Sequence, residues 1–151
     1  MDINRFTEKL QEAIRAAQSK ATRYSNQQLD VEHLFASLLE QEGGLAGSIL
    51  SRAGVNVDTL RPRLEQELDR LPKVSGPSGA PDQIFLTARL NKLLTAAEDE
   101  AKKLKDEYIS VEHVLLALTD DSGFSGRLLR EFGATRERLM QALRECAAAS
   151  A

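Results

Sequence analysis

The chain repeats itself after about 80 residues, and this internal duplication limits its fold more than any other feature of the sequence. An apolar stripe at residues 6–21 returns at residues 86–101, and the segment at 31–35 returns at 111–115. A one-residue deletion follows, after which the matches are Gly44 with Gly123, Gly47 with Gly126, Leu50 with Leu129, Gly54 with Gly133, Leu60 with Leu139 and Leu64 with Leu143. Matches at helix-ending glycines and stripe leucines indicate that one helical unit was duplicated.

Within each copy, apolar residues recur at spacings of three and four, which predicts amphipathic helices. The stripes of the first copy lie at residues 6–21, 31–39, 45–53 and 60–71. We expect Gly43 and Gly44 to end the second helix, Gly54 the third and Pro72 the fourth.

Polar residues before the stripes are suited to cap the predicted helices. Thr7 and Thr87 stand at the start of the first helix of each copy, and Asp30 and Ser110 precede the second. Side-chain oxygens of these residue types accept hydrogen bonds from the free N–H groups of a helix start. No segment alternates apolar and polar residues with β-branched enrichment, so the sequence predicts no strand.

The sequence therefore predicts an all-α fold of two four-helix repeats, related by a pseudo-twofold axis and packed into one globular domain. Two copies are too few for a solenoid, so the halves are expected to pack face to face around a shared core. We expect one domain over residues 1–151, with repeat one at 1–72 and repeat two at 83–149. Between them, residues 72–82 are rich in Pro, Gly and Ser, which predicts a linker.

The composition is that of a globular protein, with 42% hydrophobic residues, 28% charged residues and a net charge of −3. A slightly acidic chain argues against a nucleic-acid partner, because phosphate contacts need a basic face. No apolar run approaches the ~20 residues that span a bilayer, so we expect no membrane partner. The charged N-terminal segment does not resemble a signal peptide. Cys146 is the single cysteine, which excludes an intrachain disulfide and favours a reducing, cytoplasmic location.

Motifs for catalysis or metal binding do not occur in the sequence. It contains no Gly-x-x-x-x-Gly-Lys-Ser/Thr phosphate loop and no His-Glu-x-x-His pair. His33, His113 and Cys146 are too few for a zinc site with three or four ligands. Both histidines are interpreted as helix-start residues that pack beneath the linker or the other repeat. We expect no catalytic residue, no metal and no cofactor, and a domain that works by binding.

The carboxylates are interpreted as solvated or structural. The acidic runs at 98–100 and 120–121 are typical of solvent-exposed helix faces. Glu32 and Glu112 each lie in the first turn of a predicted helix, where a negative charge complements the helix dipole.

Several short segments fall in the order and at the spacing of a known family. They are Arg5-Phe6-Thr7-Glu8-Lys9, Glu32-His33-Leu34, Gln41-Glu42-Gly43-Gly44, Ala53-Gly54-Val55 and Asp69-Arg70-Leu71-Pro72-Lys73-Val74. On these segments the chain resembles the N-terminal domain of the ClpB-type protein disaggregases, and the likeness covers essentially its whole length. The start of the linker, Leu71-Pro72-x-Val74, is more similar to ClpB than to the protease-linked relatives ClpA and ClpC.

The resemblance implies a mobile module, tethered above a hexameric ATPase ring, that captures exposed apolar segments of client proteins and passes them to the pore. The implied partners are unfolded or aggregated clients, the rest of the hexameric chain, and a co-chaperone system of the DnaK type. ATP is implied only for the family's ATPase modules, which are not among these 151 residues. The alternative is an adaptor-docking domain of the ClpA or ClpC type, which binds folded adaptors and feeds a protease.

The resemblance also implies a substrate-binding site. The family's polar site residues correspond to Thr7, Asp106 and Glu112, and Leu94 corresponds to a position in the apolar groove beside them. We add Tyr108 as a contact, because its amphipathic ring suits a partly wet groove. The repeat symmetry is expected to bring the start of the first helix beside the segment 106–112, so that the polar residues form one patch.

Overall fold

The computed structural model describes residues 3–74 and 84–150, with side chains as far as Cys146. Most of the predicted linker at 72–82 therefore lies outside the described residues. The helices are the 3-10 helix η1 (Ile3–Arg5) and the α-helices α1 (Glu8–Arg23), α2 (Val31–Glu40), α3 (Leu45–Arg52), α4 (Val57–Arg70), α5 (Ala88–Lys103), α6 (Val111–Leu118), α7 (Phe124–Glu131) and α8 (Arg136–Ser150). This order confirms the all-α fold with two four-helix repeats. No helix in the described ranges is long and apolar enough to cross a membrane.

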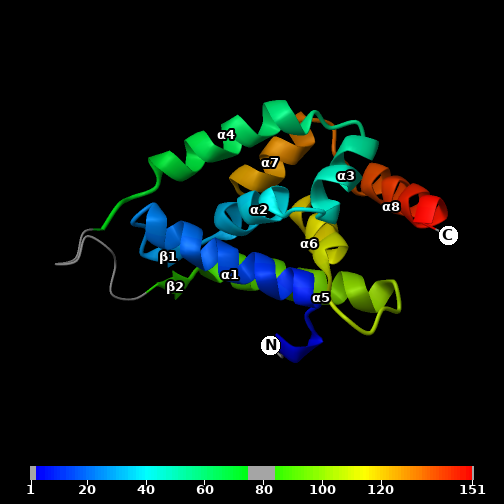
Figure 1. The fold of residues 1–151 in the computed structure, drawn as a ribbon, viewed down its shortest axis with the longest axis horizontal. Coiled ribbons are helices and arrows are strands. Elements are labelled where there is room, and N and C mark those ends of the chain that lie inside the picture. Colours follow the sequence, from blue (N-terminus) through cyan, green and yellow to red (C-terminus); the bar gives the residue numbers. More distant parts are fainter. Residues whose placement is uncertain (1–2, 75–83, 151) are drawn as a thin grey trace.

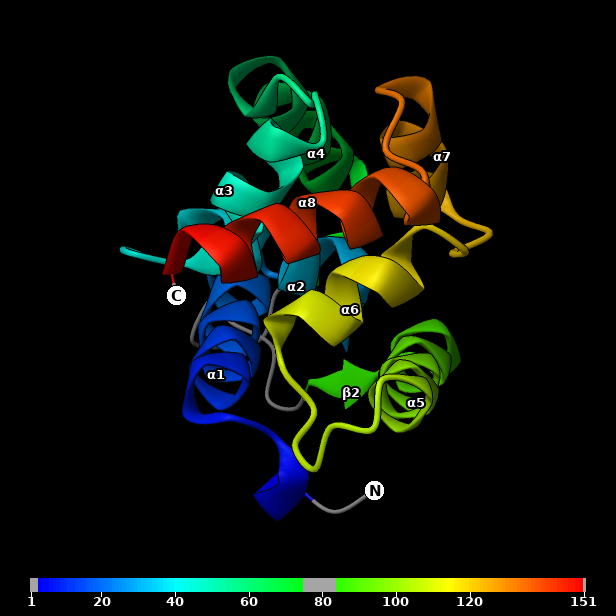
Figure 2. The ribbon, with the colours of Figure 1, turned by 90° about the vertical axis from the view of Figure 1, so that its right-hand side faces the viewer.

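The two second helices of the repeats, α2 and α6, form the centre of the molecule. In Figures 1 and 2, α1 and α5 lie on one side of them and α4 and α7 on the other, while α8 packs across α3 and α6. Every side chain from Val31 to Leu38 is buried, and so is every side chain of α6 except Glu112. A helix that is apolar on nearly all sides is stable only inside a core. The shared core predicted from the repeat is therefore built around this pair.

The prediction that the chain contains no strand is wrong in detail. Two-residue strands, β1 (Gln28–Leu29) and β2 (Phe85–Leu86), pair in parallel, with Leu29 opposite Leu86. A second bridge pairs Phe6 with Ile109. Segments this short carry no alternating pattern, and their partners lie in the other repeat, so the sequence gives no local signal for them.

These two pairings are related by the pseudo-twofold axis. Phe6 and Leu86 are equivalent in the repeat, as are Leu29 and Ile109, so each pairing joins the segment before a first helix to the segment before the other repeat's second helix. The backbone supports the same symmetry. Gly54 and Gly133, which are matched glycines, both end a helix with a positive φ, of 89° and 81°.

The helix caps form as predicted. Oγ1 of Thr7 accepts from the N–H of Leu10, and Oγ1 of Thr87 accepts from the N–H of Leu90. Asp30 and Ser110 cap α2 and α6 in capping boxes, whose third helical residues are His33 and His113. These four caps fix the starts of α1, α2, α5 and α6.

Candidate binding site

The start of α1 lies beside the loop that leads into α6. The N–H of Thr7 donates to the carbonyl of Ile109 at 2.9 Å, and the N–H of Ile109 donates to the carbonyl of Arg5 at 2.8 Å. The structure thus confirms that the repeat symmetry brings Thr7 next to the segment 106–112. We call residues 3–7 and 106–112 together the junction.

Thr7 and Glu112 each lie at the start of a helix at the junction. Thr7 lies at the cap of α1 and is half-buried. Glu112 lies in the first turn of α6 and is also half-buried, and it forms no hydrogen bond or ion pair with any residue that the structure describes. A carboxylate that is partly removed from water and has no partner among the described residues is available to a donor from another molecule.

Asp106 has a structural partner at the junction. Its Oδ2 lies 2.8 Å from Nε2 of His113, and the side chain of His113 is 1% exposed, whereas that of Asp106 is 49% exposed. Nδ1 of His113 accepts from the N–H of Ser110 at 2.9 Å, so Nε2 is the ring nitrogen that donates to Asp106. Asp106 therefore orients a buried histidine while its carboxylate remains open to solvent.

The equivalent histidine of the first repeat is held in the same way. Nε2 of His33 lies 2.9 Å from Oδ1 of the buried Asn26, and Nδ1 accepts from the N–H of Asp30 at 3.0 Å. Both histidines are thus buried residues at helix starts, as the sequence predicts.

Acid is expected to destabilise the domain through His33. Burial lowers the pKa of His33 below its ordinary value, although the nearby charges of Asp30 and Glu32 act in the opposite direction. The unfolded chain then binds this proton more readily than the folded domain, so the contribution is fully present above about pH 6.5 and decreases below it. Each unit of pKa depression corresponds to about 1.4 kcal/mol. Urea unfolding at a series of pH values from about 7.5 to about 5 measures the effect.

The control for this prediction is His33→Gln, which retains a side chain able to accept a hydrogen bond but does not titrate. Its unfolding free energy should depend less on pH than that of the unaltered protein, even where it is lower throughout. An identical pH dependence in both proteins would assign the effect to other groups.

The apolar surface of the junction consists of Tyr108 and Ile3. Their exposed fractions are 53% and 54%, similar to those of Leu45, Phe85 and Leu86 elsewhere on the surface. Leu94 differs from the expectation, because it is only 6% exposed and packs in the core. The reason is that Leu94 lies on the core stripe of α5, which packs against α6. The described structure thus offers Tyr108, but little of Leu94, to a ligand.

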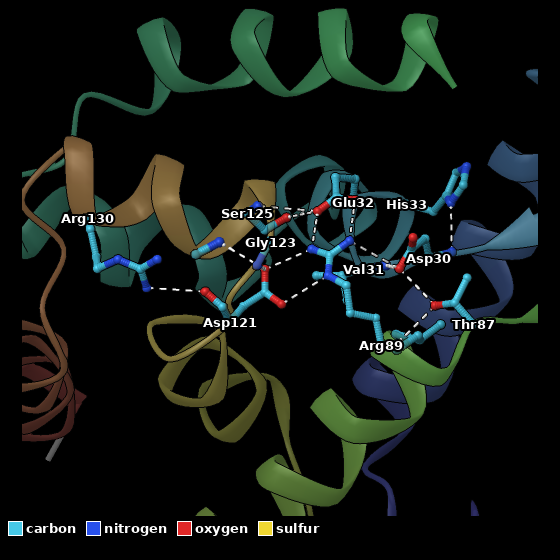
Figure 3. Close-up of polar contacts among 12 residues, drawn as sticks. Asp30, Val31, Glu32, His33, Thr87, Arg89, Asp121, Gly123, Ser125 and Arg130 are labelled. Atoms are coloured by element: carbon cyan, nitrogen blue, oxygen red, sulfur yellow. Dashed lines mark hydrogen bonds and ion pairs between the residues drawn. The ribbon is translucent and has the colours of Figure 1, made fainter. Parts of the chain in front are cut away.

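A buried ionic network joins the two repeats on the other side of the pseudo-twofold axis (Figure 3). The guanidinium of Arg89 donates twice to Glu32, at 2.7 and 3.0 Å, and twice to Asp121, at 2.8 and 3.2 Å. Ser125 also donates its hydroxyl to Glu32 at 2.7 Å. The side chains of Glu32 and Asp121 are only 3% and 6% exposed. Sequence reasoning missed this network and the role of Arg89.

The network corrects two interpretations made from the sequence. Glu32 is a buried partner of Arg89 and more than a first-turn charge, and Asp121 is not on a solvated face. Burial acts to raise the pKa of Asp121, but hydrogen bonds from Arg89 and from the N–H groups of Gly126 and Gly123 outweigh it, so the pKa lies below its ordinary value. The hydrogen bonds to Glu32 are the largest of the effects that hold the pKa of Arg89 above its ordinary value.

A second acidic run also departs from the expectation of a solvated face. Glu100, from the run at 98–100, is buried and accepts from Arg136 on α8 at 2.8 Å. Burial acts to raise its pKa, but the hydrogen bonds from Arg136 and Lys103 hold it below the ordinary value. Over the described ranges, no group of three or more His, Cys, Asp or Glu side chains is placed to hold a metal ion. The expectation of no metal and no cofactor stays a prediction.

Comparison with known proteins identifies one family. A family model described as the Clp repeat (R) N-terminal domain matches residues 5–132. The chain is 45% identical to the chaperone protein ClpB of Nitratidesulfovibrio vulgaris over 147 residues, which is 96% of this chain and 17% of that protein. It is 41% identical to ClpB of Bacillus anthracis over 143 residues, which is 95% of this chain and 16% of that protein. The chain thus spans about a sixth of the length of these curated relatives.

Solved structures share the fold. The N-terminal domain of Hsp104 from Candida albicans matches with a TM-score of 0.77 at 23% identity, covering 91% of this chain and 87% of that one. A ClpV N-domain, solved as a complex with a VipB peptide, matches with a TM-score of 0.71 at 20% identity, covering 91% and 83%.

Proposed function

Because this chain belongs to the Clp repeat N-terminal domain family, we propose that it captures unfolded or aggregated polypeptide as the N-terminal module of a ClpB-type disaggregase. The observation that carries the proposal is the alignment of nearly the whole chain with chaperones named ClpB, at 41–45% identity in the two relatives above. In this proposal the chain binds clients and ATP hydrolysis belongs to other parts of a longer, hexameric protein. The cytoplasmic location and a co-chaperone of the DnaK type belong to the same proposal.

The junction is the proposed client site. Tyr108 supplies an exposed ring for apolar client side chains, and Ile3 is a second exposed apolar residue of the junction. Glu112 supplies an acceptor without a partner in the described structure, Asp106 supplies a half-exposed carboxylate, and Thr7 lies beside them. Extended client backbone offers N–H donors that such acceptors bind without reading a particular sequence. Leu94 remains in the proposal only as a core residue of α5 that is 6% exposed.

Weak, tolerant binding follows from this geometry. A single exposed tyrosine and one exposed isoleucine provide only a small apolar contact at the junction. We expect a Kd on the order of 10–100 µM, or about −6 kcal/mol, for an unfolded segment. Such an affinity suits a module that must release its client to a motor. The ClpV N-domain complex supports the proposal to the extent that a domain of this fold holds a peptide.

Substitution of Tyr108 and Glu112 tests the site. Tyr108→Ser and Glu112→Gln should each weaken binding of a labelled, permanently unfolded protein by about 5- to 10-fold, because each removes about 1 kcal/mol or more of contact. Both positions are at least partly exposed, so melting temperatures should change little. Fluorescence anisotropy measures the binding.

Phe85→Ser is the matched control, because Phe85 is an apolar side chain of similar exposure, 48%, on β2 and outside the junction. It should leave binding unchanged. Equal losses in the Phe85 and Tyr108 variants would show that clients bind exposed apolar surface in general, and would remove the junction from the proposal.

An alternative function is docking of a folded adaptor, as in the ClpA and ClpC type. The specific observation in its favour is a TM-score of 0.65 and 25% identity to the N-terminal domain of the caseinolytic protease associated chaperone ClpD from Arabidopsis thaliana. Failure to bind unfolded proteins, together with stoichiometric binding of one folded partner, would favour this alternative.

A further inference from the structure

A groove runs between α4 and α7 on a part of the surface that the proposed client site does not use. Both helices lie on the side of α2 and α6 opposite α1 and α5 (Figures 1 and 2). The groove has a volume of about 440 Å³. Its α4 wall is formed by Arg63, Glu67 and Arg70, and its α7 wall includes Phe124, Arg127 and Leu128. We call it the α4–α7 groove.

The pseudo-twofold equivalent of this helix pair is packed with small side chains. The equivalent helices are α8 and α3, which contact each other (Figure 2). On α8, Ala142 is 1% exposed and Cys146 packs against the core. The repeat alignment pairs Ala142 with Arg63 and Cys146 with Glu67. Because the separation of two helices depends on the side chains between them, the long charged residues of α4 hold the groove open.

The arginines of the groove are incompletely neutralised. Arg63 pairs with Glu131 across the groove, so these two charges cancel. The guanidinium of Arg127 is exposed and forms no hydrogen bond or ion pair with any residue that the structure describes. Arg70 is 79% exposed and lies 3.9 Å from Glu67, which is longer than a charge-assisted hydrogen bond. The groove thus carries excess positive charge on a chain whose net charge is −3.

The inner surface of the groove is apolar. Phe124 is half-buried and packs against the core, while Leu128 is 2% exposed. Both residues also line the groove, together with Arg127 one turn of α7 away from Phe124. An apolar side chain that enters here contacts Phe124, and charged groups on either side of it remain within reach of the arginines.

We propose that the α4–α7 groove docks a short acidic segment of a partner protein, in which an apolar side chain is flanked by carboxylates. The carboxylates pair with Arg70 and Arg127, whose planar guanidinium groups suit such acceptors. A nucleic acid fits less well, because Glu67 and Glu131 in the same groove repel a continuous phosphate backbone. This proposal is independent of the client site at the junction.

Two labelled peptides test the proposal with the whole chain. One has Glu-Phe-Glu at its centre, and the other has Gln-Phe-Gln in an otherwise identical sequence. In fluorescence anisotropy at low ionic strength we expect the acidic peptide to bind about 10-fold more tightly, since it forms two exposed ion pairs that the other lacks. This preference should decrease as salt is added.

Reversal of one charge locates the binding. Arg127→Glu should abolish the preference for Glu-Phe-Glu and create one for a Lys-Phe-Lys peptide. Arg144→Glu is the matched control, because Arg144 is also exposed and lies on α8, where it contacts Gln141. It changes the net charge equally, and the preference for the acidic peptide should remain. Tyr108→Ser should also leave this preference unchanged, which separates the groove from the junction.

Three results would overturn the proposal. The first is equal affinity of the Glu-Phe-Glu and Gln-Phe-Gln peptides for the unaltered domain. The second is a loss that is as large in Arg144→Glu or Tyr108→Ser as in Arg127→Glu, since the binding would then not depend on the groove. The third is tighter binding of a single-stranded oligonucleotide than of the acidic peptide at the same salt concentration, which would assign the arginines to phosphate.

Discussion

Replacing Arg89 with methionine is expected to lower the free energy of unfolding by about 3–5 kcal/mol, which is the cost of breaking a buried ion pair from one side. The variant leaves Glu32 and Asp121 as neighbouring buried carboxylates without their shared cation. Their charges then repel each other and remain poorly solvated. For a domain of this size the melting temperature should fall by on the order of 10 °C. Thermal and urea unfolding, followed by far-ultraviolet circular dichroism, measure the change.

The repeat supplies the control for this experiment. Lys9 is equivalent to Arg89, but its side chain is more than half exposed and its nearest carboxylate is 3.8 Å away. Lys9→Met should change stability by no more than about 0.5 kcal/mol. If both variants lose similar stability, Arg89 contributes no more than the exposed Lys9. The network would then not hold the two repeats together as its geometry indicates.

Helix positions could be predicted from the sequence because their signals are local. The apolar period, the capping residues Thr7 and Thr87, and the stops at Gly54 and Gly133 act within a few residues of the helix ends that they set. The duplication then predicted the face-to-face packing, since two copies of a helical unit with one apolar side cover each other. The proximity of Thr7 to the segment 106–112 follows from the same symmetry.

The network could not be predicted in this way because its members are far apart in the sequence. Arg89 is 57 residues from Glu32, and Ser125 is 93 residues from it. Taken alone, Glu32 fits a first-turn charge and Asp121 fits a solvated run, so local rules gave the wrong environment for both. A signal did exist in the repeat alignment, where the second copy has Arg89 for Lys9 and Asp121 for Gln41. A simultaneous exchange at residues that the symmetry brings together indicates a contact.

Leu94 and Asp106 show two further limits of sequence reasoning. Leu94 carries the apolar pattern of a core stripe, which does not distinguish a groove wall from a fully buried residue. Asp106 lies in a loop, but it is seven residues before His113, as Asn26 is before His33. This shared spacing indicated that the residue at this position contacts the histidine of its repeat.

The isolated second half, residues 84–151, is expected not to fold as a monomer. Every side chain of its central helix α6 except that of Glu112 is buried, and α3 of the first repeat supplies part of that burial. Its strand β2 and the bridge at Ile109 both pair with residues of the first repeat. A unit of about 70 residues rarely has a sufficient core of its own, and this one loses half of a shared core. Exposed apolar surface on α6 then drives self-association.

We expect this half to form a homodimer that turns the pseudo-twofold axis into a true one. In such a dimer Leu86 of one copy pairs with Ile109 of the other, and Arg89 meets its own Asp121 and the Glu112 of the second copy, which takes the place of Glu32. The first half, residues 3–74, has Lys9 and Gln41 at the positions of Arg89 and Asp121. It therefore cannot form the same ionic network between two copies. Sedimentation should therefore show a dimer for the second half, and its melting temperature should depend on protein concentration. Glu112→Gln should weaken this dimer. The first half should be poorly folded. A second half that melts cooperatively as a monomer would contradict the shared core.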